Sequence, residues 1–92
     1  TAASRRLLDW LTPDDAAERT ARVESWVGDL AGRLAGLDQT DGLRLSFADG
    51  AVIHLRPSGN APELRCYTEA DDEATARALN AAVLARVRAA LG

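Results

Sequence analysis

Two short alternating segments separated by three residues constrain the fold of this chain more than any other feature. In residues 43–47, Leu, Leu and Phe alternate with Arg and Ser. In residues 51–56, Ala51, Ile53 and Leu55 alternate with Val, His and Arg. A period of two is typical of strands with one buried face. Residues 48–50 (Ala-Asp-Gly) lie between them, so the pattern predicts a β-hairpin.

The length of the hairpin loop follows from which side chains must share a face. A two-residue turn at Asp49-Gly50 would put the apolar side chains of the two strands on opposite faces. A three-residue loop with Gly50 in the left-handed conformation pairs Leu45 with Ile53 and gives one apolar face. A shift of one residue turns every side chain over, so we expect the three-residue loop.

Two amphipathic segments and a third strand complete the pattern. Residues 14–36 predict a helix with Thr12 as a candidate N-cap, Pro13 in its first turn, and an end at Gly36 and Asp38. The last residues predict a second helix, capped by Asp71, and residues 64–69 predict a strand. The apolar stripes of the helices are Val23, Trp26, Val27, Leu30 and Leu34 in the first, and Leu79, Val83, Val87 and Leu91 in the second.

The expected fold class is α+β, with an antiparallel sheet of about four strands and two helices packed on one face. Residues 6–11 are either a short strand or a helical turn, because periodicity does not decide over six residues. The 92 residues fit a single domain over 1–92. The chain contains no Met, and we expect it to be a C-terminal fragment of a longer protein.

Composition excludes several classes of function. The net charge of −3 argues against a nucleic-acid partner, and no apolar run is long enough to span a membrane. Cys66 is the only cysteine, so an intrachain disulfide is excluded, which suits a reducing cytoplasm. His54 has no ligand-type residue at metal-binding spacing, and we expect it to be structural or solvent-facing.

The segment between the second and third predicted strands carries most of the chemistry. Arg56 offers a planar fork of donors, Ser58 a hydroxyl, Gly59 a closely approachable backbone N–H and Asn60 an amide. Arg65 lies just beyond the loop and shares the polar face with Arg56. Residues 42–68 sum to a charge of +1 (three Arg against Asp and Glu), whereas the rest of the chain sums to −4. This local excess favours a site for one small anion.

The ordered motifs Asp41-Gly42-Leu43, Asp49-Gly50 and residues 56–70 (Arg-Pro-Ser-Gly-Asn-Ala-Pro-Glu-Leu-Arg-Cys-Tyr-Thr-Glu-Ala) resemble those of a known family. It is the C-terminal domain of the α-D-phosphohexomutases, which include phosphoglucomutases and phosphomannomutases. The usual pattern there is Arg-Pro-Ser-Gly-Thr-Glu-Pro, followed after two residues by Arg-x-Tyr-x-Glu-Ala. This chain departs from it at Asn60 and Ala61.

The resemblance implies a TATA-box-binding-protein-like fold and a domain that holds the non-reacting phosphate of a hexose phosphate. The whole enzyme would move phosphate between C1 and C6 of a sugar such as mannose or glucose phosphate. The implied phosphate contacts are Arg56, Ser58, Gly59 and Asn60, and Arg65 either meets phosphate or pairs with Glu63. The catalytic serine and the Mg²⁺ loop would lie in other domains of the same chain, so no catalytic residue and no metal ligand is expected here.

Three further readings stay open. Tyr67 shares the open face with Arg65 and either lines the site or packs on the sheet. Trp26 is expected in the core, whereas Trp10 is a candidate contact to a neighbouring domain. The alternative function is a stand-alone protein-interaction module of the same fold with no enzymatic role.

Overall fold

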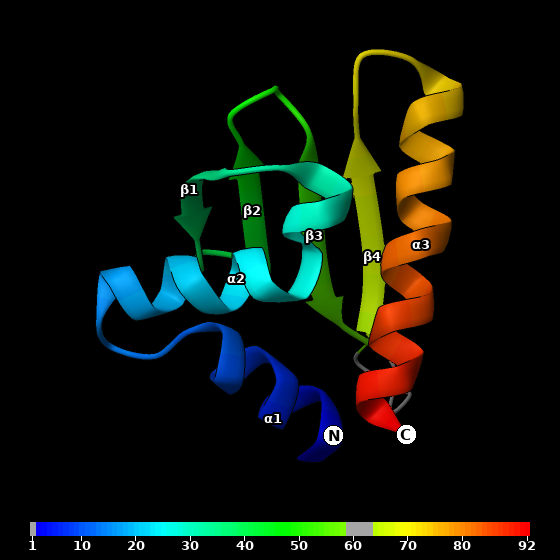
Figure 1. Ribbon diagram of the computed structural model, residues 1–92. Coiled ribbons are helices and arrows are strands. Elements are labelled where there is room, and N and C mark those ends of the chain that lie inside the picture. The colour runs from blue at the N-terminus through cyan, green and yellow to red at the C-terminus, as the bar shows by residue number, and fades with distance from the viewer. Residues whose placement is uncertain (1, 59–63) are drawn as a thin grey trace.

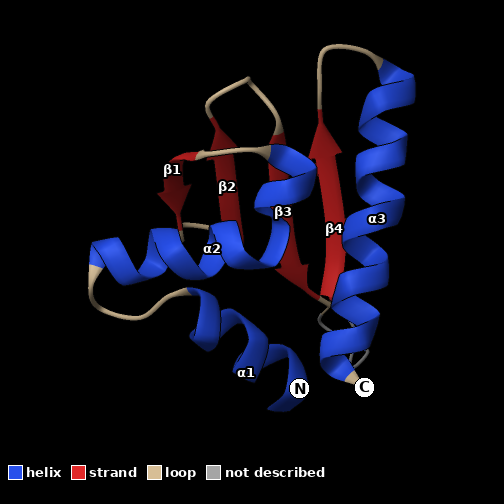
Figure 2. Cartoon of the chain, in the orientation of Figure 1, coloured by secondary structure: helices blue, strands red, loops and turns tan. Residues whose placement is uncertain are grey.

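The computed structural model describes residues 2–58 and 64–92. This part of the chain forms a four-stranded antiparallel sheet in the order β1-β2-β3-β4, together with three helices (Figure 2). This confirms the α+β class. In chain order the elements are α1 (Ala2–Leu11), α2 (Ala16–Ala31), β1 (Leu34–Asp38), β2 (Leu43–Phe47), β3 (Val52–Pro57), β4 (Leu64–Glu69) and α3 (Glu73–Leu91).

The hairpin of β2 and β3 has the expected register. Leu45 pairs with Ile53 and Leu43 pairs with Leu55, so the loop contains three residues. Gly50 has φ +94°, and its N–H donates to the carbonyl of Phe47 at 2.9 Å. The side chains of Leu43, Leu45, Phe47, Ile53 and Leu55 therefore lie on one face of the sheet, whereas Val52 lies on the other face with His54.

The core lies between this face and the three helices. It combines Leu7 and Leu11 of α1 with apolar side chains of α2, α3 and the sheet. Figure 1 shows α2 crossing in front of the sheet and α3 running beside β4. The opposite face of the sheet carries polar side chains. The fully or almost fully buried members of the core are Leu11, Val23, Val27, Leu43, Leu45, Ile53, Leu55, Val83 and Val87.

The single helix expected over residues 14–36 is wrong. The α2 helix ends at Ala31, where Gly32 takes φ +94° and its N–H donates to the carbonyl of Gly28 at 2.8 Å. After this break the chain forms β1, which pairs with β2 and has an irregularity between Leu34 and Gly36. The helix also begins later than expected, because Asp15 is the N-cap and accepts from the Glu18 N–H at 2.8 Å.

The other helix boundaries also required correction. Residues 6–11 belong to helix α1, so the fourth strand is β1 and three helices, rather than two, cover the sheet. Thr12 does not cap α2; its hydroxyl donates to the carbonyl of Leu8 at 2.7 Å. The N-cap of α3 is Asp72 rather than Asp71, and its carboxylate accepts from the N–H of Thr75 at 2.7 Å.

Hydrogen bonds of polar side chains link α3 to β4, the terminal strand of the sheet, and to α2. Asn80 donates to the carbonyl of Cys66 at 2.8 Å, and the hydroxyl of Thr68 donates to the carbonyl of Ala76 at 2.7 Å. Arg86 donates through Nη1 and Nη2 to the two carboxylate oxygens of Asp29, both at 2.6 Å. The C-terminal helix is thereby linked to the sheet and to the second helix.

Candidate functional site

Two arginines lie directly opposite each other on the open face of the sheet. Arg56 of β3 and Arg65 of β4 are cross-strand partners, and both are exposed. Like charges placed opposite each other destabilise a sheet, so this arrangement disfavours folding unless an anion offsets it. Among the described residues, no carboxylate forms an ion pair with Arg65.

Ser58 directly follows β3 and is half-buried, so the strand places it close in sequence to the arginine pair. The other two expected phosphate contacts, Gly59 and Asn60, lie outside the described residues. The same holds for Glu63, the alternative partner of Arg65. Of the expected contacts, the structure therefore places Arg56, Ser58 and Arg65 at one end of the β3–β4 pair.

Asp41, which precedes β2, is the acidic partner of Arg56. Its Oδ2 lies 3.3 Å from Arg56 Nε, and the two side chains are 64% and 45% exposed. An exposed pair of this kind contributes little stability, at most about 1 kcal/mol. The pair engages the Nε side of the guanidinium, whereas a phosphate is best bound by a fork of two parallel N–H donors.

Gly42 explains why Asp41 lies so close to β3. Its φ is +67°, and a Cβ at this position would stand 2.3 Å from the carbonyl oxygen of Leu55 and 3.2 Å from Arg56 Cα. Only glycine fits both the left-handed conformation and this close approach without a shift of the backbone. The Asp-Gly motif therefore has a steric cause, which is the contact between its backbone and the end of β3.

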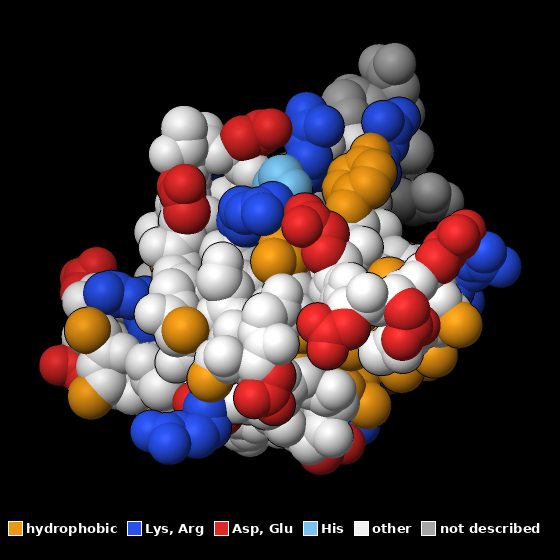
Figure 3. Space-filling view, turned by 90° about the horizontal axis from the view of Figure 1, so that it is seen from above, with side chains coloured by type: hydrophobic (Ala, Val, Ile, Leu, Met, Phe, Trp, Pro, Cys, Tyr) orange, Lys and Arg blue, Asp and Glu red, His pale blue; other side chains and the backbone are white. Residues whose placement is uncertain are grey.

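His54, two residues before Arg56 on β3, also contacts the segment of Asp41 and Gly42. Its Nε2 lies 2.6 Å from the carbonyl oxygen of Asp41, so Nε2 carries the proton and donates it. The ring faces its cross-strand partner Tyr67, with centroids 6.2 Å apart and tilted by 50°. Figure 3 shows charged side chains gathered around the histidine on this face. His54 therefore has a structural contact, and Tyr67 remains 45% exposed.

Sequence reasoning did not assign a role to Asp41, although the Asp-Gly motif was visible before β2. It also did not predict the contact of His54 with Asp41. Arg44, the third arginine of this face, lies 3.4 Å from Glu69 and has its own acidic partner. Arg44 therefore differs from Arg65, which has none among the described residues.

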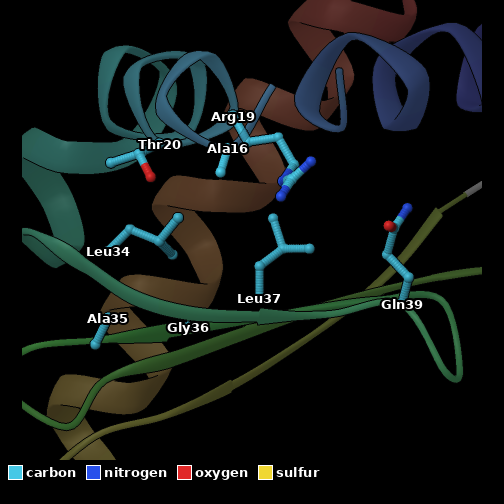
Figure 4. Close-up of a pocket in the computed structure, with 8 residues that line it drawn as sticks. All are labelled: Ala16, Arg19, Thr20, Leu34, Ala35, Gly36, Leu37 and Gln39. Atoms are coloured by element: carbon cyan, nitrogen blue, oxygen red, sulfur yellow. The ribbon is translucent and has the colours of Figure 1, made fainter. Parts of the chain in front are cut away.

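Two cavities of the described structure lie away from the paired arginines or next to the segment before β2. One of about 370 Å³ lies between the start of α2 and β1 (Figure 4), where Arg19 and Leu37 point into it. The Arg19 guanidinium already donates to the carbonyls of Pro13 and Asp14 at 2.9 and 2.8 Å. This cavity is therefore a poor candidate for an anion site. Another, of about 270 Å³, borders α1, Gly42 and Pro57.

Neither a metal centre nor a membrane span occurs among residues 2–58 and 64–92. No three His, Cys, Asp or Glu side chains come together there in a way that could hold a metal ion. The donor groups of these residues therefore do not fit the Mg²⁺ that the family resemblance implies for a whole enzyme. The helices of this part are also too short or too polar to cross a bilayer.

Fold and site together define a small α+β domain with helices on one face of its sheet and paired arginines on the other. The sequence matches the family described as "Phosphoglucomutase/phosphomannomutase, C-terminal domain" over residues 12–86. The chain belongs to this family. The match omits all of helix α1, although Leu7 and Leu11 of that helix lie in the core.

Two relatives carry names that agree with the family. A phosphomannomutase of Sinorhizobium fredii (strain NBRC 101917 / NGR234) is 63% identical over 54 residues, which is 59% of this chain and 11% of that protein. A phosphomannomutase of Salmonella muenchen is 51% identical over 55 residues, which is 60% of this chain and 12% of that protein. The matched segments thus cover only a small part of the relatives' length.

Proposed function

We propose that this chain is the phosphate-binding domain of a phosphohexomutase. Such an enzyme is an isomerase that transfers phosphate reversibly between C1 and C6 of a hexose phosphate such as mannose or glucose phosphate. The domain binds the phosphate group that is not reacting, while other domains of the same chain carry the catalytic serine and the Mg²⁺ loop. A cytoplasmic location belongs to the same proposal.

The observation that carries the proposal is the cross-strand pair of Arg56 and Arg65 at the exposed end of β3 and β4. Two guanidiniums that lie opposite each other offer charge-assisted hydrogen bonds to a doubly charged oxyanion such as phosphate. Ser58 adds a hydroxyl donor at the same end of the strands. The proposal assigns Gly59 and Asn60 to the same site by the family motif.

The strength of binding also suits this role. A charge-assisted hydrogen bond contributes about 1.5–3 kcal/mol, so a few of them hold a phosphate firmly but reversibly. A sugar bisphosphate intermediate has to turn around between two phosphoryl transfers, and irreversible binding would prevent this. The isolated 92-residue chain should bind a phosphosugar no more tightly than roughly millimolar.

The first test is Arg56→Ala in the full-length enzyme with mannose 6-phosphate as the substrate. We expect KM to rise and kcat/KM to fall at least about tenfold, because a charged contact to phosphate is lost. Arg44→Ala is the matched control, since Arg44 lies on the same face but is paired with Glu69. Unchanged kinetics of the Arg56 variant would remove this residue from the site.

A second test separates the proposal from an interaction module without enzymatic role. Mannose 6-phosphate is titrated into the isotope-labelled 92-residue chain and followed by NMR. We expect shifts at Ser58, Gly59 and Asn60, and we expect no mutase turnover by this chain alone. A spectrum that shows no change at the loop, or turnover by the isolated chain, would contradict the assignment.

A further inference from the structure

We infer that Asp41 is a positioning residue, which holds the Arg56 guanidinium with its terminal nitrogens directed to the ligand. The inference rests on the proposed function, because it assigns a role to Asp41 in the same site. It starts from the ion pair in which Asp41 Oδ2 lies 3.3 Å from Arg56 Nε. Asp41 itself does not bind phosphate, since two anions repel each other.

The geometry of the guanidinium carries the first step. Arginine binds phosphate best through two parallel N–H donors, and its side chain has many rotamers that must be ordered before it can do so. A carboxylate on the Nε side restricts the rotamers of the side chain and leaves the edge formed by Nη1 and Nη2 to the ligand. Among the described residues, these two nitrogens donate no hydrogen bond, and the ion pair with Asp41 is recorded at Nε.

The second step is that Asp41 is itself held in place by the backbone. Its carbonyl accepts the Nε2–H of His54 at 2.6 Å, and the next residue, Gly42, packs directly against the Leu55 carbonyl and Arg56 Cα. An exposed loop carboxylate would otherwise move freely. These two contacts fix the backbone of Asp41 and Gly42 against the strand that bears Arg56, so the carboxylate and the guanidinium extend from neighbouring, fixed backbone positions.

The third step concerns the charges around this unit. Arg65 lies across from Arg56 and makes the local potential more positive. Asp41 adds one negative charge on the Nε side of Arg56 and makes the potential less positive there. A merely electrostatic view predicts that removal of Asp41 improves phosphate binding. A positioning role predicts the opposite, so the sign of the change decides between the two.

The experiment is a double-mutant cycle in the full-length enzyme with Asp41→Ala, Arg56→Ala and the double variant. We expect Asp41→Ala to raise KM for mannose 6-phosphate about two- to fivefold, the range that an exposed ion pair can contribute, with kcat nearly unchanged. In the Arg56→Ala background the same change should have no further effect, because Asp41 acts through Arg56. Asp49→Ala, at the tip of the hairpin, controls for the loss of one negative charge.

His54 supplies a second set of variants. His54→Leu removes the donor to the Asp41 carbonyl and should raise KM in the same direction, whereas His54→Gln keeps an N–H donor and should restore it. A structural readout is the rate of rotation about the Nε–Cζ bond of Arg56 in ¹⁵N-arginine NMR spectra, assigned with Arg56→Lys. We expect this rotation to be faster in Asp41→Ala than in the parent protein, because the ion pair with Asp41 restrains the guanidinium.

The outcomes distinguish the two proposals. If Arg56→Ala leaves the kinetics unchanged, the proposed function fails at this residue. If Arg56→Ala has its effect but Asp41→Ala lowers KM, leaves it unchanged, or adds its full effect to that of Arg56→Ala, the positioning role is overturned and the phosphate site stands.

Discussion

Replacement of Gly42 by alanine tests the close approach between the segment before β2 and the end of β3. The added Cβ would stand 2.3 Å from the Leu55 carbonyl oxygen, a backbone atom that moves only if β3 moves. The left-handed conformation costs an L-residue roughly 1–2 kcal/mol, and forcing extra atoms into packed structure costs about 1–3 kcal/mol more. We expect Gly42→Ala to lower the free energy of unfolding by about 2–5 kcal/mol.

Gly50→Ala is the matched control for this prediction. Gly50 also has a positive φ, +94°, but nothing lies within 4 Å of the position of its Cβ. Its variant should therefore lose only the conformational part, about 1–2 kcal/mol. The difference between the two variants isolates the steric contact, and an excess of about 2 kcal/mol corresponds to a lower Tm by roughly 8–16 °C in a domain of this size.

The assay is urea unfolding of the 92-residue chain, followed by circular dichroism and tryptophan fluorescence. Equal losses of stability in the two variants would refute the reasoning, because the conformational cost alone would then account for Gly42. A large loss in Gly50→Ala would contradict it as well. Because Arg56 Cα is 3.2 Å from the added Cβ, Gly42→Ala should also impair any phosphate binding through Arg56.

Three further predictions concern the helices and the single thiol. Leu11→Ala, at a position with no exposed surface in α1, should cost about 2–5 kcal/mol in urea unfolding, whereas Arg5→Ala on the exposed side of the same helix should cost little. Equal effects would show that α1 is not part of the core. Burial raises the pKa of the Cys66 thiol from 9.0 to about 11, so alkylation by iodoacetamide at mildly alkaline pH should be about a hundredfold slower in the folded than in the unfolded chain. Alkylation at the same rate in both states would contradict a raised pKa of this half-buried thiol. Hydrogen bonds from Arg86 hold the pKa of Asp29 below 3.8; a carboxylate with a lowered folded-state pKa stabilises the fold above its ordinary pKa and loses that contribution as the pH falls. Asp29→Asn should therefore be less stable than the parent chain at neutral pH, and the difference should shrink in acid; a difference that is constant with pH would contradict this sign.

The sequence was sufficient to predict the hairpin because β2 alternates without interruption and Ile53 and Leu55 continue the alternation in β3. It was misleading at the end of α2, because Leu34 follows Leu30 by four residues and so continues a helical stripe. The structure breaks that stripe at Gly32, and β1 contains a bulge that removes the alternation by which strands are recognised. Strand β1 is determined by its pairing with β2. The local periodicity of the sequence carries no information about this pairing.

The candidate site shows the same division between local and long-range information. The donors of Arg56 and Arg65 were predicted from the motif and from strand alternation, and the register of β3 and β4 places them opposite each other. The role of Asp41 depends on a contact between residues that are 15 positions apart in the chain, through the left-handed turn at Gly42. The motif indicates that such residues occur together in the sequence. Only the folded structure shows which atom of Arg56 the Asp41 carboxylate contacts.

The hydrogen bond from Asn80 of α3 to strand β4 has a consequence for the behaviour of the chain in concentrated solution. β4 is the last strand of the sheet, and a terminal strand with unpaired carbonyls can recruit a strand from another molecule. The Asn80 amide occupies the carbonyl of Cys66 in the middle of that strand. A molecule approaching this border would have to displace an internal hydrogen bond before it could extend the sheet, which disfavours self-association into fibres.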